Sequence, residues 1–266
     1  MAPLLLGIAA LFGIGIRAQV QHVERDAAAD IAAKLTGPAK EVWLRTIPEP
    51  PFGLPFSNIR RGEILARHFS TEGLPLFTQP WRPQSGRLGE LVISLNDFSL
   101  AGLRVESLAA RIPDCRFDAG LALHEHKLRL SQSGVGQGSV TLRQEDLERF
   151  ILKKFREIKS VKVTLREGWV WVEGDGEFVL VKSHFLVLAR LRPAAGTQIV
   201  LADAKIWLND YYTVGFARDQ LLKALTPVLD LDRDLHLQGA IQLESIECHE
   251  GFLTASGKAT IPIAPG

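Results

Sequence analysis

The sequence predicts an α+β fold in which an antiparallel meander sheet packs against helices on one face. From Gly89 onward, apolar and polar residues alternate as they do in strands. Glycine turns such as Gly168 and Gly251 join consecutive strands over short distances, which makes these strands antiparallel. Two segments that begin near Gln144 and Ala217 have the period of amphipathic helices instead. This order of elements is typical of an α+β domain.

Composition sets limits on the class of protein. The chain has 266 residues, of which 46% are hydrophobic, and this is enough for a substantial core. Its formal charge of +1 creates no global field that would attract a polyanion, so nucleic acid is not an expected partner. Cys115 and Cys248 are too few for a disulfide scaffold or a four-cysteine zinc site. They could form one disulfide or remain free buried thiols.

An apolar run without charge extends from Pro3 to Ile16. It is shorter than the roughly 20 residues of a transmembrane helix and has the length of the apolar part of an export signal. We therefore interpret residues 1–18 as a signal peptide or a short membrane anchor formed by residues 3–16. The expected location is the periplasm or the cell surface. A misplaced start codon or a buried helix is the alternative.

The next segment divides into a helix and a proline-rich part. Residues 23–35 are rich in alanine and predict a short amphipathic helix that ends at Gly37. Eight of the 14 prolines lie between Pro38 and Pro83, which favours an extended loop over a packed sheet. We expect residues 19–73 to form an N-terminal helix and a proline-rich extension, and residues 74–262 to form the α+β domain.

Both main helices are expected to present an apolar face. The first begins at Gln144, and the second, Ala217–Leu229, should end or kink at Pro227. The apolar positions are Leu147, Phe150, Ile151, Phe155 and Ile158 in the first helix and Leu221, Leu222, Leu225 and Val228 in the second.

Some strands are apolar on both faces. Trp169–Val172 and Phe178–Val181 lack the alternation of a sheet with one hydrated face, so the second face needs a cover. Either a second protein layer or an apolar ligand in a groove could supply it. Trp169 and Trp171 share one face of their strand. Together with Phe150 and Phe155 of the first helix, they form either part of an ordinary core or the lining of a lipid-sized cavity.

Motifs for metal or phosphate binding are weak. His124 and His126 have the spacing of metal ligands on a strand, but the strand pattern breaks there, which favours a solvated turn. The aspartates from Asp230 to Asp234 lack the glycine and the final glutamate of a calcium loop, which favours a helix-to-strand loop. The glycines of residues 134–138 precede a strand rather than a helix, which favours a hairpin turn. No sequence motif combines a nucleophile, a base and an orienting group. We therefore expect no catalytic residue, metal or cofactor.

Four local motifs resemble one bacterial family, and they occur in the family's order. LPLFTQ at Leu74–Gln79 resembles the N-terminal signature of the LmeA-type phospholipid-binding proteins, with Leu76 and Phe77 in reversed order. VTLRQEDLERFI at Val140–Ile151 is similar to the family's strand and helix start, although Glu148 or a neighbour replaces the usual Asn. LLKALTPVLDL at Leu221–Leu231 and IQLESIECHEGFLTASG at Ile241–Gly257 resemble its C-terminal helix and closing hairpin.

The resemblance implies an exported phospholipid-binding protein that functions in envelope lipid or lipoglycan metabolism. It also implies an elongated, strongly curved sheet on two long helices, similar to tubular lipid-binding domains. Our main hypothesis is a non-catalytic protein that holds acyl chains between sheet and helices, with phospholipid and the membrane surface as partners. An envelope protein–protein interaction module with a closed core is the alternative, and an accessory enzyme is the third hypothesis. The expected lipid-binding residues are Phe77 near an entrance, Phe150, Phe155, Trp169, Trp171, Leu221 and Leu225.

Overall fold

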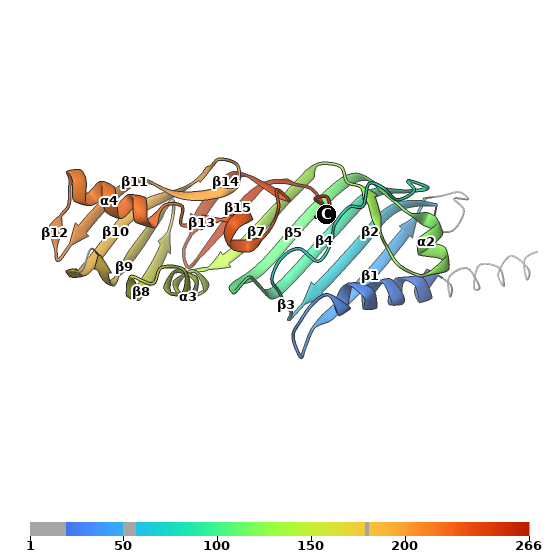
Figure 1. The fold of residues 1–266 in the computed structure, drawn as a ribbon, viewed down its shortest axis with the longest axis horizontal. Helices are drawn as coiled ribbons and strands as arrows, with labels where there is room; N and C mark the ends of the chain where they lie inside the picture. The colour runs from blue at the N-terminus through green and yellow to red at the C-terminus, as the bar shows by residue number, and fades with distance from the viewer. Residues whose placement is uncertain (1–19, 50–56, 179–180, 266) are drawn as a thin grey trace, which may run out of the picture.

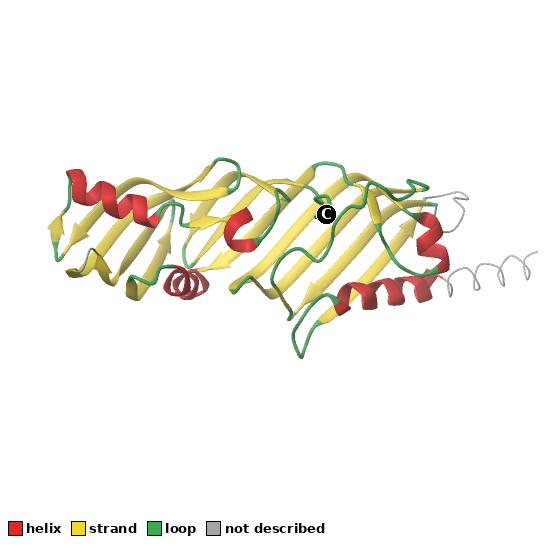
Figure 2. Ribbon diagram, in the orientation of Figure 1, coloured by secondary structure: helices red, strands yellow, loops and turns green. Residues whose placement is uncertain are grey.

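The computed structural model describes residues 20–49, 57–178 and 181–265. Within these residues the strands form two sheets that lie side by side along an elongated molecule (Figure 1). Helices lie along the margins of the sheets and in front of them in the view of Figure 2. The predicted α+β class and the strongly curved sheet are confirmed. The predicted leader, residues 1–18, lies outside the described residues.

The larger sheet has the strand order β1-β2-β4-β5-β7-β15-β14, with β3 beside β4 and β6 beside β5. Neighbouring strands of this sheet are antiparallel, except that β2 and β3 both run parallel to β4. The meander is therefore interrupted at β4. The strands are β1 (Glu41–Pro48), β2 (Asn58–Arg67), β3 (Ser70–Thr71), β4 (Gly86–Leu100), β5 (Leu103–Phe117), β6 (Leu130–Gln132), β7 (Gly136–Arg143), β14 (Ile241–His249) and β15 (Phe252–Ala259).

The smaller sheet is antiparallel, with the order β12-β11-β10-β9-β8 and with β13 beside β11. Backbone bonds join it to the larger sheet: Gly168 N–H donates to Cys248 O at 3.0 Å, and Leu243 N–H donates to Gly196 O at 2.7 Å. One hydrophobic cluster therefore runs through both sheets. The strands are β8 (Ile158–Arg166), β9 (Trp169–Phe178), β10 (Val181–Ala194), β11 (Gln198–Leu208), β12 (Tyr211–Tyr212) and β13 (Leu229–Asp230).

The prediction of an extended loop for residues 38–83 is wrong. β1 and β2 lie in this segment and form one side of the larger sheet, with β2 paired to β4. The prolines do not prevent this pairing because they lie at the ends of strands and between them. Pro48 is the last residue of β1, and Pro75, Pro80 and Pro83 lie between β3 and β4.

The N-terminal helix covers residues 20–33 and confirms the helix predicted there. The two long helices of the prediction are shorter than expected, with eleven residues each. α3 ends before Phe155, and Ile158 already belongs to β8; α4 ends before Pro227, as that proline requires. The labelled helices are α2 (Ala119–His124), α3 (Gln144–Lys154), α4 (Gly215–Leu225) and α5 (Leu231–Leu235).

α3 also completes the hydrogen bonds of an edge strand. β8 ends the smaller sheet, and two of its amides turn toward α3. Val163 N–H donates to Glu148 Oε1 at 2.8 Å, and Leu165 N–H donates to Gln144 Oε1 at 3.3 Å. Because an open strand edge invites pairing with other chains, these side chains protect it.

The structure resolves three motif interpretations. Gly136 and Gly138 lie inside β7, so the predicted hairpin turn is wrong for them. Asp230 caps α5, accepting hydrogen bonds from Asp232 N–H and Arg233 N–H, so it is part of a helix start rather than of a solvated loop. Both cysteines are free and buried, and burial raises the pKa of each thiol, which keeps it protonated and unreactive.

Candidate functional site: an apolar groove

The concave face of the larger sheet forms an apolar groove. Its floor consists of residues from β2, β4, β5, β7, β15 and β14 that share one face of the pleated sheet. Two rows of paired residues cross the strands, and all their members except Ile246 line the groove. The first row is Ile64, Ile93, Ala110, Gly138, Gly257 and Leu243, and the second is Ala66, Leu95, Leu108, Val140, Ala255 and Ile246.

Small residues in the first row deepen the groove. Ala110, Gly138 and Gly257 lie next to one another on β5, β7 and β15. A Cβ atom added at Gly138 would lie 3.1 Å from the Cβ of Ala259, so even a methyl group would crowd the floor. Space in the groove therefore depends on these positions remaining small.

Three segments far apart in the sequence cover the groove. The N-terminal helix contributes Ile31 and the chain just after it contributes Leu35. A strap of residues 71–76 crosses the opening, and residues 229–240, which include α5, cover the end near the smaller sheet. Side chains hold the strap: His236 Nδ1 lies 2.8 Å from Glu72 O, and Lys34 Nζ lies 3.5 Å from Pro75 O. Both contacts are on exposed side chains, whereas Leu74 and Leu76 of the strap pack against the hydrophobic clusters below it.

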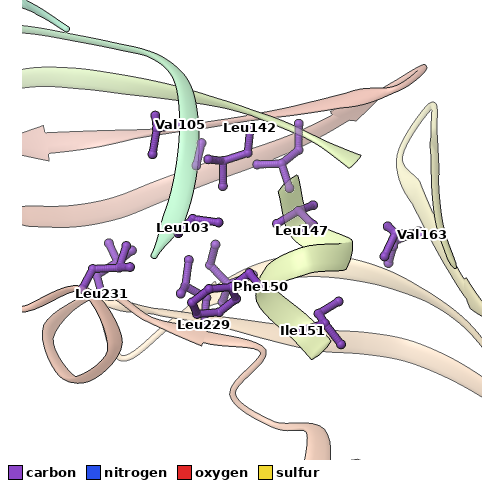
Figure 3. Close-up of a cluster of buried hydrophobic side chains, with 14 of the residues drawn as sticks. Leu103, Val105, Leu142, Leu147, Phe150, Ile151, Val163, Leu229 and Leu231 are labelled. Atoms are coloured by element: carbon purple, nitrogen blue, oxygen red, sulfur yellow. The ribbon is translucent and has the colours of Figure 1, made fainter. Parts of the chain in front are cut away.

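α3 closes the groove at the junction of the two sheets. Figure 3 shows Phe150 of α3 beside Leu229, which lines the groove, with Leu103 of β5 nearby. Lys154, at the end of the same helix, binds the covering segment: its Nζ lies 2.5 Å from Asp234 Oδ2, 3.2 Å from Pro227 O and 3.1 Å from Val228 O. The helix therefore positions residues 229–235 over the groove.

The lining has the chemistry of a hydrocarbon site. Among the described residues that line the groove, none is charged, and the polar side chains are limited to Thr71, Ser139, Ser256 and Thr260. The cavity volume is about 160 Å³, close to that of engineered cavities that stay dry and admit benzene. An acyl chain is larger than benzene, so a lipid can enter only if the strap or the helices move outward. The groove can bind apolar chains but offers them no titratable group.

The nearest titratable groups lie outside the groove, around the N-terminal helix. Arg129 makes two hydrogen bonds to Asp30, at 2.6 and 2.9 Å, and these bonds lower the pKa of the Asp30 carboxyl. One turn earlier, His126 Nδ1 lies 2.7 Å from Asp26 Oδ2, which lowers the pKa of Asp26. Both pairs attach the helix to the segment between α2 and β6.

His126 belongs to the one group in the described part of the chain whose donor atoms lie close enough for a metal ion. His22, Asp26 and His126 place one donor atom each within 4.8 Å of one another. The sequence motif His124–Glu125–His126 is not the basis of this group, because His124 ends α2 and is not a member. The hydrogen bond between Asp26 and His126 already pairs these side chains, so the arrangement is explained as a clamp on the helix.

None of the seven residues predicted to bind lipid is among those that line the groove. Phe150, Leu221 and Leu225 are buried in the cluster that continues from the groove, and Phe155 packs against it. Phe77 is half-buried next to the strap, whose Leu74, Pro75 and Leu76 do line the groove. Contact of these residues with lipid stays a prediction.

Trp169 and Trp171 lie on the outer face of the smaller sheet. Their strand neighbours Val170 and Val172 point inward to the core cluster, and the tryptophans are half-buried. Within the described part of the chain, they are not among the residues that line the groove. The guanidinium of Arg190 lies 4.6 Å from the ring centre of Trp169, and that of Arg166 lies 5.6 Å from that of Trp171.

The sequence contained a signal for the groove that strand-by-strand reasoning missed. The alternation of Leu103 and Val105, and of Val140 and Leu142, marks the apolar face of each strand. Only the register shows that Leu108 lies opposite Val140 and that small residues adjoin in the next row. The covers formed by residues 71–76 and 229–240 have no periodic pattern to identify them.

A curved, mainly antiparallel sheet with an apolar groove on its concave face defines a class of proteins with room for a hydrophobic ligand. The comparison with known families agrees: the sequence model of the LmeA-like phospholipid-binding family matches residues 73–258. The chain belongs to this family, and the predicted resemblance is confirmed. No curated protein and no solved structure matches the chain. Within the described residues, no helix is both long and apolar enough to cross a bilayer.

Proposed function

We propose that this protein holds the acyl chains of a phospholipid in the groove of the larger sheet, without catalysis, and serves lipid or lipoglycan metabolism or transfer in the cell envelope. The observation that carries the proposal is the uncharged, almost wholly apolar lining of the groove. Membership of the LmeA-like phospholipid-binding family supports it. The apolar run at residues 3–16 supports export.

Burial of hydrocarbon supplies enough free energy for binding. At about 0.8 kcal/mol per CH₂ group, a sixteen-carbon chain gains about 13 kcal/mol before the costs of ordering the chain and opening the groove. No charged clamp is needed for useful affinity. The head group then lies outside the groove, and its identity contributes less than the chain does.

Native mass spectrometry of protein purified without detergent, followed by extraction and identification of lipids, tests the proposal. Near-stoichiometric phospholipid is the expected result for the wild type. Val140→Trp should fill the groove and remove most of the lipid, because Val140 lies in the second row of the floor. Leu95→Trp on β4 tests the same row from another strand.

Thr141→Trp is the matched control. Thr141 is the next residue of β7, lies on the opposite face, and pairs with Ser107 and Thr254. It should keep the wild-type lipid content. A clean ligand-free mass that persists after incubation with phospholipid vesicles would contradict the proposal and favour an interaction module with a closed core.

A further inference from the structure

The outer face of the smaller sheet carries an aromatic platform, which consists of Trp169 and Trp171 of β9, Leu186 and Leu188 of β10, and Trp207 of β11. The register joins them: Trp171 lies opposite Leu188, and Leu186 lies opposite Trp207. All five side chains are half-buried, although they project away from the core. Tyr212 of β12 extends the platform, with its ring centre 5.6 Å from that of Trp207.

In the described part of the larger sheet, the outer face carries one exposed tryptophan, Trp43 beside Leu65 on β1 and β2, and its middle strands are polar. On its outer face, Ser107 of β5, Thr141 of β7 and Thr254 of β15 lie side by side. Polar residues of this kind are what a hydrated sheet face requires. The platform is therefore a feature of the smaller sheet and not a general property of the curved fold.

Cations surround the platform. Arg166 and Arg190 stack on its tryptophans, and Lys162 and Lys205 flank the same face. Arg192, on this face of β10, is paired with Asp203 at 3.3 Å. In the described part of this face, six cations (Lys162, Arg166, Lys182, Arg190, Arg192 and Lys205) outnumber the four carboxylates of Glu173, Asp175, Glu177 and Asp203. A shallow hollow of about 230 Å³ lies between Lys162, Thr164, Arg166, Trp171, Glu173 and Leu186.

The end of the same sheet exposes further apolar side chains. Tyr211 of β12 is 80% exposed, Val214 in the connection to α4 is 63% exposed, and Phe216 at the start of α4 is 78% exposed. Tyr212 connects residues 211–216 to the platform, whereas Tyr211, opposite the core-facing Leu208, lies on the other face of β12 at the end of the sheet. A solvated protein surface gains nothing from such a concentration of aromatic residues.

We propose that the aromatic platform and residues 211–216 dock on an anionic phospholipid bilayer. Tryptophan and tyrosine rings favour the boundary between head groups and acyl chains, because one part of each ring system is apolar and another donates a hydrogen bond. Lysine and arginine beside them bind lipid phosphates, and their long stems cover apolar surface. The hollow beside Trp171, with Lys162 and Arg166 at its rim, has the size and charge to receive a head-group phosphate.

This inference rests on the proposed function, because a protein that takes up phospholipid must meet a membrane. It assigns separate surfaces to the two tasks. The groove lies on the concave side of the larger sheet, whereas the platform lies on the outer face of the smaller sheet. Docking can therefore hold one end of the elongated molecule at the bilayer and leave the groove free (Figure 1).

Fluorescence quenching by lipids with brominated acyl chains tests the docking surface in the full chain. The vesicles contain phosphatidylcholine and phosphatidylglycerol. Tryptophan emission of the wild type should be quenched, and Trp169→Phe combined with Trp171→Phe should remove most of the quenching. Trp43→Phe is the control, because Trp43 lies in the larger sheet and is likewise covered by an arginine, Arg67, at 4.9 Å. It should leave the quenching unchanged.

Vesicle flotation tests the cations. Arg166→Gln and Arg190→Gln should each lower affinity for anionic vesicles by about fivefold, whereas Arg67→Gln should not. Quenching that depends on Trp43 or Trp81, or no quenching at all, would overturn the inference and favour a protein or glycan partner for this face. Lipid content, measured on the same preparations, separates the two proposals: loss of quenching with retained lipid contradicts only the docking surface, and quenching without bound lipid contradicts only the groove.

Discussion

Lys154 Nζ at the end of α3 lies 2.5 Å from Asp234 Oδ2 of α5, and this ion pair connects the helix at the sheet junction to the segment that covers the groove. Both side chains are largely shielded, with 20% and 15% of their surface exposed. The same ammonium group also donates to Pro227 O and Val228 O. The contact therefore supports the cover together with backbone bonds to β11, in which Val228 N–H donates to Ile199 O at 2.9 Å.

Replacement of Lys154 by Met should destabilise the protein by about 2–4 kcal/mol, because it leaves a shielded carboxylate and two carbonyls without their donor. Urea unfolding followed by circular dichroism measures the change. Lys153→Met is the matched control, since Lys153 is exposed, and it should change stability by less than about 0.5 kcal/mol. Equal effects of the two substitutions would show that the ion pair has no special role.

Phe150→Ala should cost about 3–5 kcal/mol, because Phe150 is 6% exposed and fills the junction between the sheets (Figure 3). Leu152→Ala, on the exposed side of α3, should have little effect on the unfolding midpoint. If Phe150→Ala removes bound lipid while the unfolding free energy stays within about 1 kcal/mol of the wild type, Phe150 is a lipid contact rather than core.

Gly138→Val should destabilise the protein by about 1–3 kcal/mol and reduce the bound lipid, because a larger side chain crowds Ala259 and fills the groove. Gln137→Val lies on the exposed, opposite face of β7, where a β-branched residue suits the strand, and should preserve both properties. Thermal unfolding and native mass spectrometry measure the two effects. Unchanged lipid content in Gly138→Val would place the ligand elsewhere.

Acid should weaken the attachment of the N-terminal helix. Hydrogen bonds from Arg129 hold the pKa of Asp30 below its ordinary value of 3.8. Because the folded-state pKa is depressed, the stability that this pair contributes is fully present above the unfolded-state pKa and is lost as pH falls through the folded-state pKa. Asp30→Asn should lower stability at pH 7 by about 1–2 kcal/mol and flatten its pH dependence below about pH 4. If the acid unfolding curve of Asp30→Asn has the same slope as that of the wild type, the Asp30–Arg129 pair is not the cause of the acid sensitivity.

Local patterns were sufficient for the longer strands from β4 onward, for the start of α3 and for the family motifs, but they missed the two-residue strands β12 and β13. Leu147, Phe150 and Ile151 are buried as their spacing predicts, because helical periodicity records which side faces the core. The same pattern extended too far at Phe155 and Ile158, since it cannot distinguish the last turn of a helix from an apolar residue that starts a strand. The high proline content of residues 38–83 gave a wrong prediction of a loop. Prolines are tolerated at strand ends and in connections, so they do not exclude strands between them.

The sequence by itself determined the α+β class, the apolar face of α3 and of the alternating strands, and the family. Only the tertiary structure decided that the groove lies in the larger sheet and that Trp169 and Trp171 lie on the outside of the smaller one. Alternation along a strand indicates which of its two faces is apolar. When both faces are apolar, the pattern does not indicate which one packs against the core. That choice depends on cross-strand register, on the parallel pairing of β2 with β4, and on covers that approach from residues 20–35, 71–76 and 229–240. These are contacts between distant segments, and no local pattern contains them.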